Sequence, residues 1–171
     1  MNDDKLSELR SAFDRAFAEP RAPAAVPQTD FLALRLNGDP YAVRLSEVAS
    51  LQADRAFVRA PSLLPEFVGI AGFRTVLTPV YDLGALLGYS TQRSTKWLLM
   101  AKATSPIGFA FEAFDGHLRV PASHFSIDAD AEGVTCGSVR NGEDLLPLIH
   151  LPSLVEGIAR RIKALGPSQE R

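Results

Sequence analysis

The sequence is poor in the residues that support several common kinds of chemistry. It contains one cysteine, Cys136, which excludes an internal disulfide and a cysteine-based zinc site and is typical of a small buried side chain. Its three histidines, His117, His124 and His150, form no HxH or HxxxH pair, so only the fold could assemble a metal site from them. The glycine-rich phosphate-binding motifs and the GxSxG motif of hydrolases do not occur. We therefore expect no cofactor and no metal.

A basic excess and a long apolar run are also missing. The formal net charge is -2, whereas proteins that bind nucleic acids or membrane surfaces need a basic excess. No apolar run approaches the roughly 20 residues of a membrane span, and the charged start MNDDKLSELR has no signal-peptide core. We therefore expect a cytoplasmic protein that binds no nucleic acid and does not insert into the membrane.

Residues 1–19 are expected to form an amphipathic helix, followed by a proline- and alanine-rich linker over residues 20–30. The apolar stripe of this helix consists of Leu6, Leu9, Phe13 and Phe17. Two interpretations of the stripe stay open. It folds back on the rest of the chain, or it recruits a partner, which could be a second copy of the chain.

From residue 31 the apolar pattern changes to the period of two that is typical of strands. Three turn dipeptides between such runs indicate hairpins, namely Asn37-Gly38, Asp115-Gly116 and Asn141-Gly142. Further strands are expected at 48–54, 67–73, 76–81 and 96–103. Many short strands with turns at this spacing indicate a mainly β protein built from barrels or a sandwich.

Two helices are expected to interrupt the strands. Asp82 can cap a short helix over 83–87 that ends at Gly88. A second helix is expected to begin near Ser153, where Ser153 and Glu156 fit a capping box. Its apolar stripe consists of Leu154, Ile158, Ile162 and Leu165.

The stretch GFRTVLTPVYDLGALLG, residues 72–88, places polar residues in an apolar run. Asp82, in Tyr-Asp-Leu-Gly, loosely resembles the Asp-Thr-Gly of aspartic proteases, but Leu83 cannot supply the hydroxyl that follows the aspartate. An enzyme that uses Asp82 with a second carboxylate is one alternative, and a helix cap is the favoured one. Arg74 is either a solvated or ion-paired arginine, with Asp82 as a candidate partner, or a protein-contact residue.

The same stretch resembles the motif Gly-Val-x-Asn-Leu-Arg-Gly-x-x-x-Pro-Val-x-Asp-Leu of CheW-like domains. The matching segments are Gly69-Ile70-Ala71-Gly72-Phe73-Arg74-Thr75 and Pro79-Val80-Tyr81-Asp82-Leu83. The resemblance covers residues 31–165 and leaves 166–171 as a C-terminal tail. It implies two intertwined five-stranded SH3-like β-barrels and an adaptor without enzymatic activity. Such adaptors link chemoreceptor cytoplasmic tips to the regulatory domain of the histidine kinase CheA, and thereby associate with membrane receptor arrays.

The resemblance also implies which residues contact partners. Arg74 matches the arginine of the receptor-binding groove, Gly72 and Phe73 precede it, and Val48 and Leu51 match apolar groove positions. Gly69, Pro79 and Asp82 are expected to be structural positions of the motif. Two departures stand out, because Gly72-Phe73-Arg74-Thr75 replaces Asn-Leu-Arg-Gly and Ser50 replaces a glutamate. They motivate an alternative function, a specialised scaffold that has lost either the receptor or the kinase contact.

Overall fold

The structure is a computed structural model that describes residues 26–90, 95–128 and 133–166. The strands are β1 (Gln28–Leu36), β2 (Asp39–Arg44), β3 (Val48–Ala53), β4 (Phe67–Phe73), β5 (Val76–Asp82), β6 (Trp97–Ala101), β7 (Gly108–Phe111), β8 (Ala113–Pro121), β9 (Phe125–Ile127), β10 (Thr135–Asn141) and β11 (Asp144–Ile149). The helices are α2 (Leu83–Leu86) and α3 (Leu151–Leu165), with 3-10 turns η1 (Leu45–Glu47) and η2 (Ala122–His124). The predicted N-terminal helix and most of its linker lie outside the described residues, although β1 already takes in residues 28–30.

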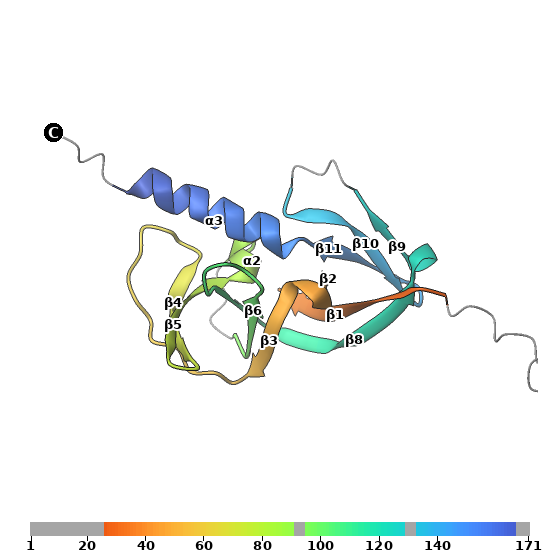
Figure 1. Cartoon of the computed structure of the whole chain (residues 1–171), viewed down its shortest axis with the longest axis horizontal. Helices are drawn as coiled ribbons and strands as arrows, with labels where there is room; N and C mark the ends of the chain where they lie inside the picture. Colours follow the sequence, from red (N-terminus) through yellow and green to blue (C-terminus); the bar gives the residue numbers. More distant parts are fainter. Residues whose placement is uncertain (1–25, 91–94, 129–132, 167–171) are drawn as a thin grey trace, which may run out of the picture.

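The strands form two sheets, and the chain passes from one sheet to the other and back again (Figure 1). One sheet has the order β8-β1-β2-β11-β10-β9 and the other β3-β6-β7-β5-β4. The mainly β, intertwined fold class is therefore confirmed. The expected strand number is correct for one sheet and one too low for the other, which has six strands because β9 pairs with β10. In the five-stranded sheet a single bridge between Val58 and Ile70 takes the corresponding place.

The described strands and helices form two copies of one structural unit. The first runs from β1 to α2 and the second from β6 to α3, and the two sheets pair equivalent strands in the same order. The interval from Val58 to Ser126 equals that from Ile70 to Ser138, and both pairs close a sheet. The first two strands of each unit complete the sheet of the other unit. This exchange is the physical basis of the intertwining.

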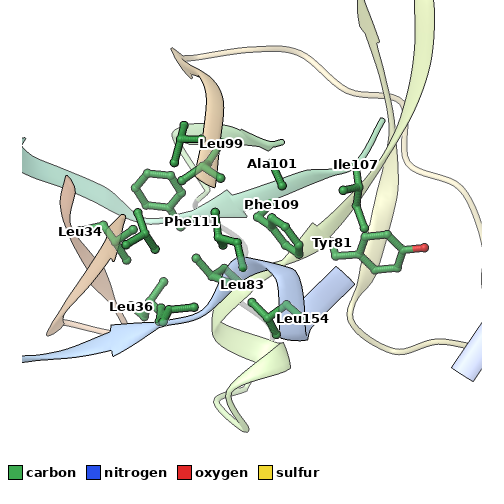
Figure 2. Packing of buried hydrophobic residues seen from close by; sticks show 14 of the residues in the cluster. Leu34, Leu36, Tyr81, Leu83, Leu99, Ala101, Ile107, Phe109, Phe111 and Leu154 are labelled. Atoms are coloured by element: carbon green, nitrogen blue, oxygen red, sulfur yellow. The ribbon is translucent and has the colours of Figure 1, made fainter. Parts of the chain in front are cut away.

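Three apolar clusters form the core. One lies within the six-stranded sheet and includes Phe31 and Cys136, and another lies within the five-stranded sheet and includes Met100 and Ala110. The third and largest joins the two sheets to α3 (Figure 2). Strand β7 is buried along its whole length, because its alternate side chains enter two different clusters. Burial is also the main reason why the pKa of the Cys136 thiol is raised.

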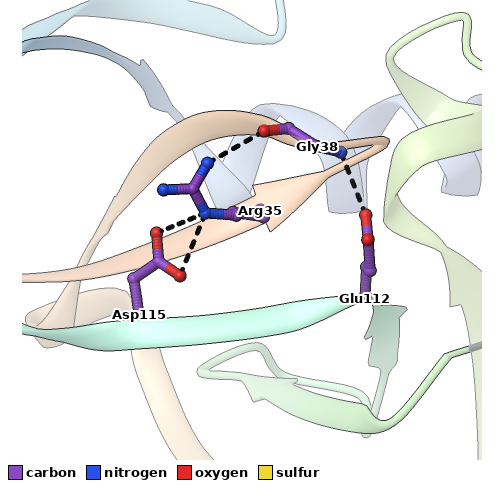
Figure 3. Close-up of polar contacts among 4 residues, drawn as sticks. All are labelled: Arg35, Gly38, Glu112 and Asp115. Carbon is purple, nitrogen blue, oxygen red and sulfur yellow. Dashed lines mark hydrogen bonds and ion pairs between the residues drawn. The ribbon is translucent and has the colours of Figure 1, made fainter.

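Polar contacts tie the first hairpin to the second unit (Figure 3). The turn residues Asn37 and Gly38 have φ values of 54° and 86°, as the Asn-Gly signal predicts. The Gly38 N–H donates to the Glu112 carboxylate at 3.0 Å, and the Arg35 guanidinium donates to the Gly38 carbonyl at 3.0 Å. Arg35 Nε also lies 2.9 Å from the Asp115 carboxylate on β8. These contacts fix where β1 and β2 enter the other unit's sheet.

Helix α3 begins at Leu151 rather than at Ser153, and the predicted capping box is wrong. Ser153 Oγ lies 2.7 Å from His150 Nδ1, inside the first turn of the helix. The Leu151 N–H instead donates to the Glu47 carboxylate at 3.0 Å. Glu47 lies in η1, just before β3, so a distant element supplies the anion that a helix N-terminus favours.

We expect Glu47→Ala to lower the free energy of unfolding by about 1–2 kcal/mol, because it removes the acceptor at the start of α3. Chemical denaturation measures this change. Glu47→Gln keeps a side-chain oxygen at the same place and should cost less than half as much. Equal losses for the two variants would show that the contact with Leu151 is not what Glu47 contributes.

Candidate partner-binding surface

The hairpin of β4 and β5 presents an apolar outer face. Its register pairs Ile70 with Pro79 and Gly72 with Leu77, and antiparallel partners share a face of the sheet. The bridge to Val58 adds a third segment at the same face. Val58 and Leu77 are each 74% exposed. We call this surface the hairpin face, and it consists of Val58, Ile70, Gly72, Leu77 and Pro79.

Arg74 stands at the tip of the hairpin, at the end of the hairpin face. Arg74 and Thr75 form the turn, with φ values of 42° and 72°. The side chain of Arg74 is exposed, and its guanidinium carbon lies 5.6 Å from the centre of the Phe73 ring. Among the described residues no carboxylate forms an ion pair with Arg74. Its charge is therefore available to a partner.

Asp82 lies at the opposite end of β5 from this turn, about 20 Å away at the usual rise per residue of a strand. Its side chain is buried and accepts a hydrogen bond from the Ala85 N–H at 3.1 Å, which caps α2. The ion pair between Asp82 and Arg74 that was one interpretation of the sequence is therefore not formed. Glu66 is the other buried acidic residue among those described. Its backbone carbonyl accepts a hydrogen bond from the Asp82 N–H at 2.7 Å.

The described parts of the chain contain no group of three or more His, Cys, Asp or Glu side chains that could hold a metal ion. No helix in those same parts is both long and apolar enough to cross a membrane.

The other predicted contact residues on β3 point inward. Val48 is buried in the cluster that joins the sheets, and Leu51 packs against that cluster. Ser50 pairs with Met100, which belongs to the cluster inside the five-stranded sheet, and its hydroxyl oxygen is buried. Their roles in partner contact stay predictions, as do those of the N-terminal stripe, which lies outside the described residues.

Phe73 also packs against the cluster inside the five-stranded sheet, although it adjoins Arg74 in sequence. Of the residues predicted to contact partners, Gly72 and Arg74 are the two that the structure brings together on one exposed surface.

Sequence reasoning missed Val58, Leu77 and Arg55. The Arg55 guanidinium donates to the Gly72 carbonyl, so an arginine flanks the hairpin face beside the strand as well as at its tip. Leu77 could have been found, because it interrupts the alternation expected for a strand with one buried face. Val58 carried no such signal, because its pairing with Ile70 joins segments with no regular pattern between them.

The profile of the CheW-like domain matches residues 30–159. The chain belongs to the CheW-like domain family. It is 28% identical over 102 residues to the chemotaxis protein CheW of Bacillus subtilis (strain 168). That match covers 58% of this chain and spans 64% of the length of the relative.

A solved structure with a similar fold is that of the scaffolding protein TtCheW from Thermoanaerobacter tengcongensis. The TM-score is 0.65 and the sequence identity 14%, over 72% of this chain and 90% of that one. At this identity the likeness concerns the fold alone. It agrees with the two intertwined sheets described above.

Within this CheW-like domain, the turn shows what one departure from the family motif costs. Thr75 replaces the glycine of Asn-Leu-Arg-Gly, yet its φ of 72° lies in the left-handed region that favours glycine and strains a β-branched residue. The second unit places Gly142 in its own hairpin turn, with a φ of 63°. Gly142 corresponds to Arg74, so the left-handed conformation of the first turn residue is common to both units, whereas Thr75 adopts its own at an energetic cost.

We expect Thr75→Gly to raise the free energy of unfolding by about 1 kcal/mol, because it relieves this strain. Denaturant titration measures the change. Thr135→Gly in the extended strand β10 is the matched control, and it should lower stability because glycine weakens a strand. A loss of stability in both variants would mean that Thr75 is not strained in solution.

Proposed function

We propose that this CheW-like protein is a non-enzymatic adaptor that couples the cytoplasmic tips of chemoreceptors to a CheA-type histidine kinase in chemotaxis signalling. The observation that carries the proposal is the exposed hairpin face with Arg74, an arginine without a carboxylate partner among the described residues, at its end. Solitary exposed apolar residues are ordinary on a protein surface, but a contiguous set beside a free arginine is typical of a protein contact. Membership of the CheW-like family supports the choice of partners.

The chemistry of the hairpin face fits a helical partner. A receptor tip is a helical hairpin, and an amphipathic helix binds through apolar side chains that repeat every three or four residues. Val58, Ile70 and Leu77 would contact that apolar stripe. Arg74 would fix the register by pairing with a carboxylate or with the carbonyls at a helix C-terminus. Its fork of donors suits both kinds of acceptor.

The kinase would contact a different part of the surface, so that one adaptor holds both partners at once. Each interface can then be modest, because linked interfaces strengthen one another in an array. Association with the membrane would follow from the receptor, and the protein itself would stay in the cytoplasm.

A second candidate function is a specialised scaffold that has kept only one of the two contacts. The observation that favours it is Ser50, which stands at the position of a family glutamate and whose hydroxyl oxygen is buried. A buried hydroxyl cannot replace an exposed carboxylate in a contact with a receptor. The replacement of the family asparagine by Gly72 also removes a polar side chain from the hairpin face.

Calorimetric titration of the full chain against the kinase regulatory domain and against a receptor cytoplasmic fragment tests the proposal. We expect micromolar dissociation constants for both, about 8 kcal/mol of binding free energy each. A ternary complex should form when both partners are added, because the two contacts use different surfaces. Binding to one partner alone supports the specialised scaffold, and binding to neither partner contradicts both functions.

A further inference from the structure

A groove runs between the end of α3 and the segment that leads into β4. It has a volume of about 400 Å³ and lies at the end of the β4–β5 hairpin opposite to Arg74. The apolar side chains that line it are Leu63, Leu64, Phe67, Tyr81, Ile162 and Leu165. Burial is the main reason why the pKa of the Tyr81 phenol is raised, which agrees with an apolar floor.

The groove lies where the buried part of an apolar stripe on α3 ends. Leu154 and Ile158 belong to that stripe and are buried in the core, as the helical spacing predicts. Ile162 and Leu165 continue it but remain 48% and 47% exposed. The last turns of α3 therefore extend beyond the core and leave apolar side chains without a protein cover.

The end of α3 is also strongly basic. Residues 157–166 contain Arg160, Arg161 and Lys163 and no acidic residue. Arg161 contacts the buried carboxylate of Glu66, whereas Arg160 and Lys163 form no ion pair within the described part of the chain. An occupant of the groove should therefore be apolar on one side and carry an excess of acidic residues.

The N-terminal sequence has both properties. Its stripe of Leu6, Leu9, Phe13 and Phe17 supplies large apolar side chains at helical spacing. Residues 1–19 also contain five acidic side chains against three basic ones. The C-terminal sequence 167–171, PSQER, contains no large apolar side chain and does not fit.

The N-terminal segment cannot readily reach the groove of its own chain. Strand β1 begins at one end of the long axis of the molecule, and α3 ends at the other (Figure 1). The nine residues from Glu19 to Gln28 span about 30 Å at full extension. A spherical domain of this size is already about 40 Å across.

We propose that the N-terminal stripe of one copy docks in the α3 groove of a second copy. The two surfaces differ, so the contact is head to tail, and a pair of copies retains one free stripe and one free groove. Such heterologous contacts build rings or open chains of copies. The protein would therefore associate with itself through surfaces separate from the hairpin face, and this property does not depend on the proposed function.

Sedimentation of the full chain over a range of concentrations tests the proposal. The mass of one copy is 18.5 kDa, and we expect the average mass of the wild type to rise above this value with concentration. Phe13→Glu in the stripe and Leu165→Glu in the groove should each abolish the rise. Leu145→Glu is the matched control, because it changes an exposed leucine on another part of the surface and should leave the rise unchanged.

Mixing the two defective variants identifies the occupant. Phe13→Glu keeps its groove and Leu165→Glu keeps its stripe, so a mixture should form dimers of one copy of each and nothing larger. Added salt should weaken these dimers, because the stripe is acidic and α3 is basic. A wild type that stays monomeric throughout overturns the proposal. Self-association of the Phe13→Glu variant without the other variant also overturns it, because α3 would then pair with α3.

Discussion

Gly69→Ala is expected to lower the free energy of unfolding by about 2–4 kcal/mol. The φ of Gly69 is 153°, and a Cβ atom there would lie 2.1 Å from the Val58 carbonyl oxygen. That oxygen accepts from the Ile70 N–H at 2.8 Å, and the Val58 N–H donates to the Ile70 carbonyl at 2.8 Å. A methyl group would push the Val58 segment away and break both hydrogen bonds, and with them the closure of the five-stranded sheet.

Gly72→Ala is the matched control for this prediction. Gly72 lies three positions further along the same strand, and a Cβ atom there meets nothing within 4 Å. Its stability should change by less than about 1 kcal/mol. Gly137→Ala should repeat the large loss, because a Cβ atom there would lie 2.0 Å from the Ser126 carbonyl oxygen. Equal stabilities of the Gly69 and Gly72 variants in denaturant titrations would contradict the role of Gly69 in closing the sheet.

The local signals in the sequence predicted the strands well, because turns and alternation act over a few residues. The expected strand at 67–73 coincides with β4, and the Asn37-Gly38 turn occurs. The hairpin expected at Asn141-Gly142 also forms, but its turn is Gly142-Glu143. The turn expected at Asp115-Gly116 is wrong, because both residues lie inside β8. The order of strands in the sheets depends on contacts between the two units, which no local pattern encodes. The resemblance to a family supplied the intertwined arrangement instead.

The orientation of β3 shows how one extra residue in a strand can make a prediction from the period of two fail. A strict period of two places Val48 and Ser50 on one face and Leu51 on the other. A bulge between Val48 and Ser50 changes this, so that Val48 and Leu51 both face the cluster that joins the sheets. Val48 is therefore buried in that cluster, and Leu51 is partly buried against it. A bulge of this kind depends on the pairing with β6 and leaves no clear mark in the sequence.

The repeated unit, by contrast, left a mark in the sequence that periodicity alone does not reveal. Gly69, Pro79 and Leu83 recur at the same spacing as Gly137, Pro147 and Leu151. The helices that end the two units then diverge. Asp82 caps α2 through its own side chain, whereas α3 depends on Glu47, which lies 104 residues before Leu151. A cap supplied across such a distance could not be predicted from local sequence.

Arg74→Glu is expected to weaken binding of a receptor cytoplasmic fragment by about 2–4 kcal/mol, roughly 30- to 700-fold in the dissociation constant. Arg74 has no carboxylate partner within the described residues, so the loss reflects its contact with the receptor and not a broken internal pair. The reversed charge would also face the acceptor that the arginine contacts. Calorimetric titration measures the change, and Arg74→Lys should give an intermediate loss because it keeps the charge without the fork of donors.

Arg140→Glu is the control that separates this contact from a general effect of charge. Arg140 is an exposed arginine on β10, the strand of the second unit that corresponds to β4, and its reversal changes the net charge by the same amount. We expect it to leave receptor binding unchanged. Both variants should keep the thermal stability of the wild type, because both side chains are exposed. Equal losses of binding would assign the effect to overall charge, and no loss in Arg74→Glu would remove the hairpin tip from the receptor contact. Kinase binding that persists in Arg74→Glu would show that the two partners use separate surfaces, as an adaptor requires.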